Sequence, residues 1–193
     1  MTTLIGLSGS LRRGSFNTAL LRTAATLMPA DSTLELRTLH GIPLYDADLE
    51  AGTGLPESVS ALKAAIAAAD AVLLATPEYN NGIPGVFKNA IDWLSRPASD
   101  IRRVFGEKPV GLIGASPGGF GTILSQAAWL PVLRVLGTRH WSGSRMLVSR
   151  AGQVFDENGA LRDAKLQEQL QAYLAGFVSY VRESRARSQP GSS

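Results

Sequence analysis

Two short runs in the middle of the chain are almost continuously apolar, AVLLAT at residues 71–76 and PVGLIGA at residues 109–115. A strand with one face in solvent alternates apolar and polar residues, whereas a strand buried on both faces does not. Strands of the second kind belong to parallel sheets that helices cover on each side. The two runs therefore predict the centre of a parallel sheet.

The rest of the chain alternates strand-like and helix-like patterns. Further strands are expected at residues 3–7, 33–39 and 145–149. Apolar residues recur at helical spacing in five segments, at residues 17–28, 57–69, 85–94, 121–136 and 163–183. This alternation, with right-handed crossovers, predicts an α/β fold: a flavodoxin-like, doubly wound, five-stranded parallel sheet with helices on both faces. In that strand order a ligand site lies where the first and third strands end.

The length of 193 residues and the hydrophobic content of 45% predict one domain with a single substantial core. We place this domain at residues 1–184. The end of the chain from Arg182 is polar and basic and lacks large apolar residues, so residues 185–193 are expected to form a disordered tail. The 19 basic and 16 acidic residues are scattered along the chain, which gives no indication of nucleic-acid binding.

Several kinds of chemistry are excluded by what the sequence lacks. Because it has no cysteine, it offers no disulfide, thiolate metal site or thiol nucleophile. Neither His40 nor His140 stands in a motif for a hydrolase triad or a metal site. The alternating carboxylates Asp46, Asp48 and Glu50 lack the pattern of a calcium loop and are expected in a solvated loop. Without a signal peptide or a run of membrane-spanning length, the protein is expected in the cytoplasm, away from membranes.

The first strand is followed by GSLRRGSFN at residues 9–17, a loop rich in hydrogen-bond donors that no acidic residue precedes. A tight turn into a helix offers free backbone N–H groups and a partial positive charge. The hydroxyls of Ser10 and Ser15 and the guanidinium of Arg12 add donors, so the loop suits a phosphate. It lacks the spacing of an ATP phosphate loop or a dinucleotide fingerprint. The alternative is that Ser15 and Asn17 merely start a helix.

The third strand is followed by TPEYNNGIPG at residues 76–85, where Pro77 ends the strand and Pro84 begins the next helix. Between the prolines, Tyr79 offers an aromatic face and Asn80 an amide. This combination suits a flat heteroaromatic ring with hydrogen-bonding edges, and flavin mononucleotide (FMN) would satisfy both loops. The alternative is that the tyrosine packs on the rim and the asparagines make a turn.

Taken together, GSLRRGSFN at residues 9–17 and TPEYNNGIPGVFKNAIDW at residues 76–93 closely resemble the NADPH-dependent FMN reductase family, including its bacterial quinone and chromate reductase members. LYDADL at residues 44–49 is also similar to that subgroup, and the resemblance covers nearly the whole chain. It implies bound FMN, NADPH or NADH as reductant, and a quinone or similar small-molecule acceptor such as free flavin, chromate or an azo compound.

Carried onto this sequence, the resemblance implies two groups of FMN contacts. The first group surrounds the phosphate and the ribityl chain: Ser10, Arg12, Ser15, Phe16 and Asn17. The second group lines the isoalloxazine: Pro77, Glu78, Tyr79 and Asn80. We expect backbone atoms of residues 78–80, more than the Glu78 carboxylate, to meet the pyrimidine and N5 edge of the ring.

A third loop, GASPGGFGTILSQ at residues 114–126, follows the fourth strand. Its glycines let backbone N–H groups approach a ligand closely, where they can face charge that develops near N1 and O2 of a reduced flavin. Ser116 is the position that matches the flavin contact of the family. For the other residues of this loop, a simple turn into the next helix is the alternative.

The resemblance implies that the cofactor carries the hydride chemistry, so no catalytic side chain is expected. A flavodoxin-type electron carrier without direct NADPH oxidation is one alternative, although such carriers are usually acidic and this chain is basic. A flavin-free module that binds a phosphorylated metabolite is another. A homodimer or homotetramer is implied, with Trp129 as an interface candidate. Arg102 and Arg103 are candidate contacts for the 2′-phosphate of NADPH.

Overall fold

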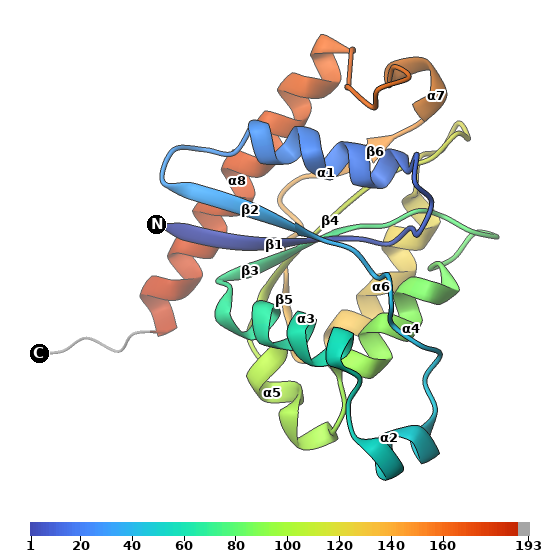
Figure 1. Ribbon diagram of the computed structural model, residues 1–193. Helices are drawn as coiled ribbons and strands as arrows, with labels where there is room; N and C mark the ends of the chain where they lie inside the picture. The colour runs from blue at the N-terminus through green and yellow to red at the C-terminus, as the bar shows by residue number, and fades with distance from the viewer. Residues whose placement is uncertain (189–193) are drawn as a thin grey trace, which may run out of the picture.

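A parallel sheet forms the centre of the computed structural model, which describes residues 1–188 (Figure 1). The strand order is β2-β1-β3-β4-β5, and β6 also pairs with β4. This is the predicted flavodoxin-like order, with the first and third strands adjacent. The strands are β1 (Thr2–Ser8), β2 (Ser32–Arg37), β3 (Ala71–Ala75), β4 (Pro109–Ala115), β5 (Arg139–His140) and β6 (Met146–Val148).

Helices cover both faces of the sheet, as predicted (Figure 1). One face carries α1 and α8, and the other carries α3, α4, α5 and α6. The helices are α1 (Phe16–Thr26), α2 (Ala47–Thr53), α3 (Glu57–Ala68), α4 (Gly85–Leu94), the 3-10 turn η1 (Ala98–Asp100), α5 (Ile101–Val104), α6 (Ile123–Val135), α7 (Ala151–Val154) and α8 (Ala164–Ser188).

The three shortest α-helices were not predicted, because segments of four to seven residues are too short to show a helical period. The carboxylates expected in a solvated loop belong to one of them. Asp46 caps α2, and its carboxylate accepts a hydrogen bond from the Asp48 N–H at 2.8 Å.

The sheet has a hydrophobic core on each face, and successive side chains of a central strand enter the two cores in turn. In β3, Leu73 packs with α1 and α8, whereas Val72 and Leu74 pack with the helices of the opposite face. Every residue of β3 and β4 is buried. The two apolar runs in the sequence are thus the strands that helices cover on both sides.

The fifth position of the sheet is split into β5 and β6, where one strand at residues 145–149 was expected. After Trp141 the chain leaves β4, and it returns at β6. The reason is the Trp141 indole, which packs edge-on against Tyr173 of α8 at 4.7 Å. A Cβ at Gly143 or Gly176 would lie 2.7 or 2.9 Å from this ring. The ring therefore fills a space that these two glycines leave open, and the chain bends around it.

The prediction of a disordered tail from residue 185 is wrong for its first part, because α8 continues to Ser188. Arg182 donates to a carbonyl oxygen in the loop before β2 at 3.0 Å. Arg185 forms an ion pair of 3.1 Å with the aspartate that precedes β3. Polar residues that looked like a solvated end therefore hold the helix against the sheet. The remainder of the predicted tail, residues 189–193, lies outside the described residues.

A buried lysine joins α3 to the turn before α5. The Lys63 side chain is 2% exposed, and its ammonium donates to the Arg96 carbonyl and lies 2.7 Å from the Asp100 carboxylate. Arg103 binds the same carboxylate through two hydrogen bonds of 2.8 and 2.7 Å. Hydrogen bonds from Arg103 and Lys63 hold the pKa of Asp100 well below its usual range.

This pKa shift predicts a loss of stability in acid. A carboxyl whose pKa is depressed by folding stabilises the fold above its unfolded pKa of about 4 and loses that contribution as the pH falls further. We expect Asp100→Asn to melt at a lower temperature than wild type at pH 7, and the difference to shrink below pH of about 4. Thermal unfolding between pH 7 and 2.5 measures this. A difference that stays constant with pH would contradict it.

A second prediction concerns Gly9, which follows β1. A Cβ at this position would lie 2.1 Å from Phe87 Cδ1 and 2.8 Å from Pro77 Cδ. Overpacking of this kind costs about 1–3 kcal/mol, so we expect Gly9→Ala to lower the free energy of unfolding by that amount. Urea denaturation measures it. Gly52→Ala is the control, since nothing lies within 4 Å of a Cβ there, and an equal loss in both variants would refute the steric explanation.

Candidate functional site

Three loops meet at the carboxyl edge of the sheet, on the right of Figure 1. Loop one is residues 9–15 after β1, loop three is residues 76–84 after β3, and loop four is residues 116–122 after β4. The Gly9 N–H donates to the Ala75 carbonyl at 2.9 Å, and the Thr76 N–H donates to the Ile113 carbonyl at 2.9 Å. These bonds extend the ladder beyond the strands and hold the starts of the loops side by side.

Loop one leads into α1 through a capped helix N-terminus. The Ser15 hydroxyl accepts a hydrogen bond from the Thr18 N–H at 3.3 Å, so Ser15 is the N-cap. The alternative that Ser15 starts a helix is therefore correct. The N–H groups of Phe16 and Asn17 lie in the first helical turn, where no intrahelical acceptor exists, and they remain donors for a ligand.

The Asn17 side chain has a role that the sequence did not reveal. Its amide nitrogen donates to the Ala115 carbonyl at 2.9 Å, and its oxygen accepts from the Ala115 N–H at 2.9 Å. The side chain is buried and pairs like a neighbouring strand with the end of β4. The amide does not cap α1, because both its polar atoms hold α1 against the sheet, and its contact with an FMN phosphate stays a prediction.

The exposed Arg12 and the half-buried Phe16 form a pair at loop one. The Arg12 guanidinium lies 5.1 Å from the centre of the Phe16 ring, a cation–π distance, and Phe16 stacks on Phe155 at 5.7 Å. Arg12 is exposed, and within residues 1–188 it forms no ion pair. Its hydrogen-bond donors are therefore available to an anion.

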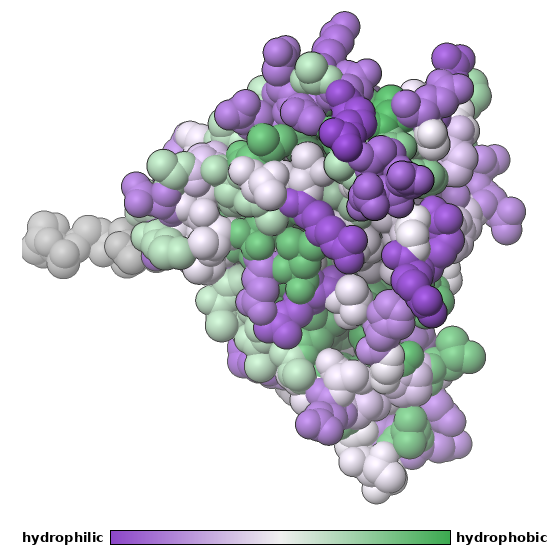
Figure 2. All heavy atoms as spheres, turned by 45° about the horizontal axis from the view of Figure 1, so that its top comes forward, coloured by the Kyte–Doolittle hydropathy of each residue, from purple (hydrophilic) through white to green (hydrophobic). Residues whose placement is uncertain are grey.

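The surroundings of loop one are polar and open to solvent. A hollow of about 420 Å³ lies between loop one, including Arg13, and residues 152–159. Asp156 borders this hollow, but its carboxylate accepts hydrogen bonds from the Ala160 N–H and Arg162, and these interactions lower its pKa. Figure 2 shows hydrophilic side chains over much of the upper and right-hand part of the face that it presents.

Loop three carries a tight turn at its tip. Tyr79 and Gly82 exchange two backbone hydrogen bonds of 3.2 and 3.0 Å. Between them Asn80 and Asn81 have φ values of 50° and 62°, the left-handed values of a type I′ turn that asparagine tolerates. The asparagines therefore make the turn, as the alternative held. The Tyr79 side chain is 50% exposed and presents its ring to solvent instead of packing away.

The Glu78 carboxylate faces α6. One of its oxygens accepts hydrogen bonds from the Leu124 and Ser125 N–H groups at 2.8 and 3.0 Å. Pro77 beside it is buried. With the carboxylate engaged at the start of α6, the backbone of loop three is the part that stays available, and its contact with a ring remains a prediction.

A hydrogen bond joins the two ends of loop four, whereas the backbone at its centre is open. The Ser116 hydroxyl donates to the Gly121 carbonyl at 2.5 Å, and the Ser116 N–H donates to the Val148 carbonyl at 2.9 Å. Gly118 accepts a hydrogen bond from the Arg150 N–H at 2.9 Å. A Cβ at Gly119 would meet nothing within 4 Å. The backbone at the centre of the loop is thus accessible to a ligand. The hydroxyl hydrogen of Ser116 is not, because it is donated to the Gly121 carbonyl.

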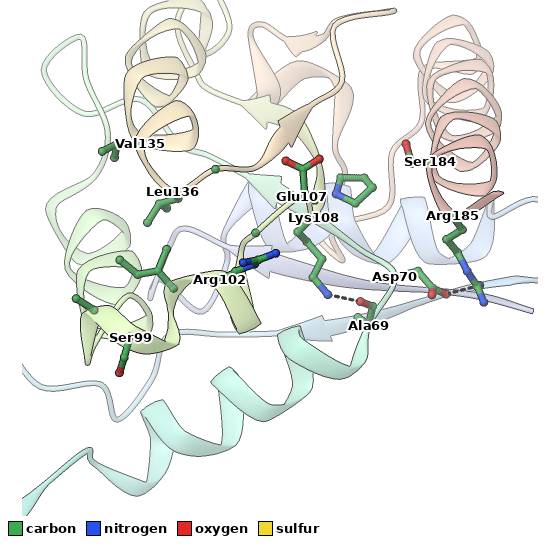
Figure 3. A pocket seen from close by; sticks show the side chains of 15 residues that line it. Ala69, Asp70, Ser99, Arg102, Glu107, Lys108, Val135, Leu136, Ser184 and Arg185 are labelled. Atoms are coloured by element: carbon green, nitrogen blue, oxygen red, sulfur yellow. Dashed lines mark hydrogen bonds and ion pairs between the residues drawn. The ribbon is translucent and has the colours of Figure 1, made fainter. Parts of the chain in front are cut away.

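Arg102 lines a hollow near the amino-terminal end of β4, the edge of the sheet opposite the three loops (Figure 3), and Arg103 follows it in α5. Arg103 is bound to Asp100, and the hollow has a volume of about 1010 Å³. Other charged groups there are engaged, since Arg185 pairs with an aspartate and Lys108, whose pKa is lowered by burial, donates to the end of α3. The structure therefore places both candidate contacts for the 2′-phosphate of NADPH away from the three loops.

Trp129, the candidate interface residue, lies in the core and not at the surface. Trp129 is fully buried, and its indole N–H donates to the Thr76 hydroxyl at 3.0 Å. It therefore belongs to the core, and its side chain cannot form a subunit contact. Trp93 is also buried, and its indole N–H donates to the Pro43 carbonyl at 2.9 Å.

The chemistry of the donors limits what this site can hold. Loop one offers backbone N–H groups and an arginine without an acid, loop three offers an exposed aromatic ring, and loop four offers open backbone. A phosphate ester of a planar heteroaromatic compound fits this arrangement, and FMN is such a compound. Within residues 1–188 no three His, Asp or Glu side chains are grouped so as to hold a metal ion. No helix in this range is both long and apolar enough to span a membrane.

Comparisons with known proteins agree with these features. A family model described as NADPH-dependent FMN reductase matches residues 2–153, which include all three loops. The chain is 42% identical over 182 residues to an NAD(P)H-dependent FMN reductase of Pseudomonas aeruginosa, covering 94% of this chain and 96% of that protein. It is 37% identical over 177 residues to a 2-hydroxy-1,4-benzoquinone reductase of a Burkholderia species, covering 92% and 94%.

A solved structure gives the same result. FerB, a flavoenzyme NAD(P)H:(acceptor) oxidoreductase from Paracoccus denitrificans, matches with a TM-score of 0.83 and 35% sequence identity. The match covers 95% of this chain and 99% of that chain. The chain is therefore an oxidoreductase that belongs to the NADPH-dependent FMN reductase family.

Proposed function

We propose that this chain binds FMN at the carboxyl edge of its sheet, takes hydride from NADPH or NADH, and passes it to a quinone or a similar small acceptor. The observation that carries the proposal is that an acid-free phosphate loop and a tight turn with an exposed tyrosine follow adjacent strands. Relatives named FMN reductase, hydroxybenzoquinone reductase and flavoenzyme NAD(P)H oxidoreductase support it. Free flavin, chromate and azo compounds are further candidate acceptors.

Loop one would hold the phosphate and the ribityl chain. The backbone N–H groups of Phe16 and Asn17 and the partial charge of the α1 N-terminus attract the phosphate, and Arg12 adds a charged hydrogen bond. The Ser10 hydroxyl accepts from the Arg12 N–H at 3.3 Å and keeps its own hydrogen for a ligand. Ser15 acts through its capping bond, which fixes the direction of the helix amides.

Loops three and four would hold the ring. Pro77, Glu78, Tyr79 and Asn80 supply a platform whose tip is fixed by the type I′ turn. Ser116 shapes loop four so that its central amides stay open. Bound FMN supplies the hydride acceptor and donor, so the chain's task is to bind, orient and admit two substrates in turn. We also propose that the reaction takes place in the cytoplasm.

We also propose that the chain forms a homodimer or a homotetramer. Large apolar side chains are exposed along α6 and in the adjoining loop four: Phe120, Leu124, Leu130 and Val135. Val135 is 79% exposed and Phe120 is 84% exposed. Association of two copies would remove such surface from water, which favours the assembly. Light scattering of the purified protein gives the number of subunits.

The first test is a visible absorption spectrum recorded without oxygen before and after one addition of NADPH. We expect a flavin spectrum that bleaches within seconds and returns when a benzoquinone is added. A flavin spectrum that persists after NADPH would identify an electron carrier. A colourless protein that does not retain added FMN would refute the assignment of loop one to the FMN phosphate.

A second test concerns Arg12. Removing a charged hydrogen bond to the phosphate should raise the FMN dissociation constant about tenfold or more in Arg12→Ala. Flavin fluorescence during titration of the apoprotein measures the constant. Arg102→Ala is the matched control, because Arg102 lies at the opposite edge of the sheet and should leave the constant unchanged. Equal affinity in wild type and Arg12→Ala would remove Arg12 from the site.

A further inference from the structure

Glu78 joins loop three to α6, although 46 residues separate it from Leu124. Thr122, the residue before α6, makes no side-chain capping bond of its own. The N–H groups of Leu124 and Ser125 are bonded to the Glu78 carboxylate instead, at 2.8 and 3.0 Å. A carboxylate at a helix N-terminus is stabilised by the partial positive charge there. Glu78 therefore supplies the cap that the local sequence of α6 lacks.

A buried polar cluster lies directly below this contact. The Thr76 hydroxyl is 2.8 Å from the Ser125 hydroxyl and accepts from the Trp129 indole N–H at 3.0 Å. All three side chains are fully buried. The first turns of α6 are thus attached to the end of β3 in two places. Thr76 binds α6 side chains inside the core, and Glu78 binds α6 amides at the rim of the site.

Side-chain packing also connects α6 to loop one. The Trp129 ring packs edge-on against Phe87 of α4 at 4.9 Å. Phe87 in turn fills the space beside Gly9, where an added Cβ would overlap its ring at 2.1 Å. Loop one, loop three, α4 and α6 therefore form one packed unit, in which Glu78 lies between the platform residues Pro77 and Tyr79.

We infer that Glu78 is a positioning residue of the redox site: its carboxylate holds the loop-three platform against α6, the α6 amides offset part of its charge, and the remaining charge disfavours the reduced flavin. The inference rests on the proposed function, because it takes the ring of FMN to lie on that platform. Reduction adds electrons to the ring, so an isolated carboxylate beside it would disfavour the reduced state. The helix N-terminus lessens this penalty by attracting the same carboxylate.

The inference can be separated from a role in stability alone by two substitutions at one position. Glu78→Gln keeps an oxygen acceptor for both amides but removes the charge, whereas Glu78→Ala removes both. A matched control is Asp163→Asn, since the Asp163 carboxylate accepts the Leu166 N–H at 2.9 Å at the start of α8 and Asp163 is not part of loops one, three or four. Each holoprotein is measured for FMN dissociation constant, midpoint potential of bound FMN, and melting temperature.

We expect Glu78→Gln to retain FMN within about threefold of wild type and to shift the midpoint potential in the positive direction. We expect Glu78→Ala to shift it in the same direction and to weaken FMN binding about tenfold, because the platform loses its attachment. Asp163→Asn should leave both quantities unchanged. A Glu78→Gln protein whose potential equals that of wild type would overturn the inference about charge. A Glu78→Ala protein that folds and binds FMN as tightly as wild type would overturn the inference about positioning.

The wild-type protein distinguishes these failures from failure of the proposed function. If wild type retains FMN and oxidises NADPH while the variants behave as it does, the role of Glu78 alone is refuted. If wild type does not retain FMN, both the proposed function and the role of Glu78 are refuted. Should Glu78→Ala not fold, Glu78→Gln still decides the question, since it keeps the capping acceptor.

Discussion

Burial of β3 and β4 on both faces is the constraint on which the rest of the structure depends. No residue of either strand is exposed, so helices must cover both sides of the sheet, and strands joined through helices run parallel. Parallel strands end on a common edge. Loops one, three and four are far apart in the chain, yet they become neighbours there. The candidate site is in this sense a consequence of how the core is buried.

The polar groups of the backbone account for much of the detail at that edge. Ends of strands and helices leave N–H and C=O groups that must be paired where water is excluded. Asn17 pairs with Ala115, Ser15 caps α1, and Glu78 caps α6. These three side chains thus stabilise the frame, whereas Arg12 and Tyr79 are exposed at the loops.

Fold alone would not identify the chemistry, since flavodoxin-like sheets serve many functions. The charge pattern of the loops is more informative. Loop one contains no acid, and the acid in loop three is directed toward a helix N-terminus. Both features favour a ligand that brings negative charge and gains more on reduction. Family membership, which rests on the whole chain, agrees with this electrostatic picture.

The sequence by itself determined the sheet order, the long helices, the family and the loops of the candidate site. β4 and α4 even have the bounds expected, because apolar periodicity and proline positions are properties of neighbouring residues. Only the tertiary structure decided the partner of Asn17, the burial of Trp129 and the split around Trp141. Each of these depends on contacts between residues dozens of positions apart. Such contacts form only when the elements pack, and no local pattern in a single sequence records them.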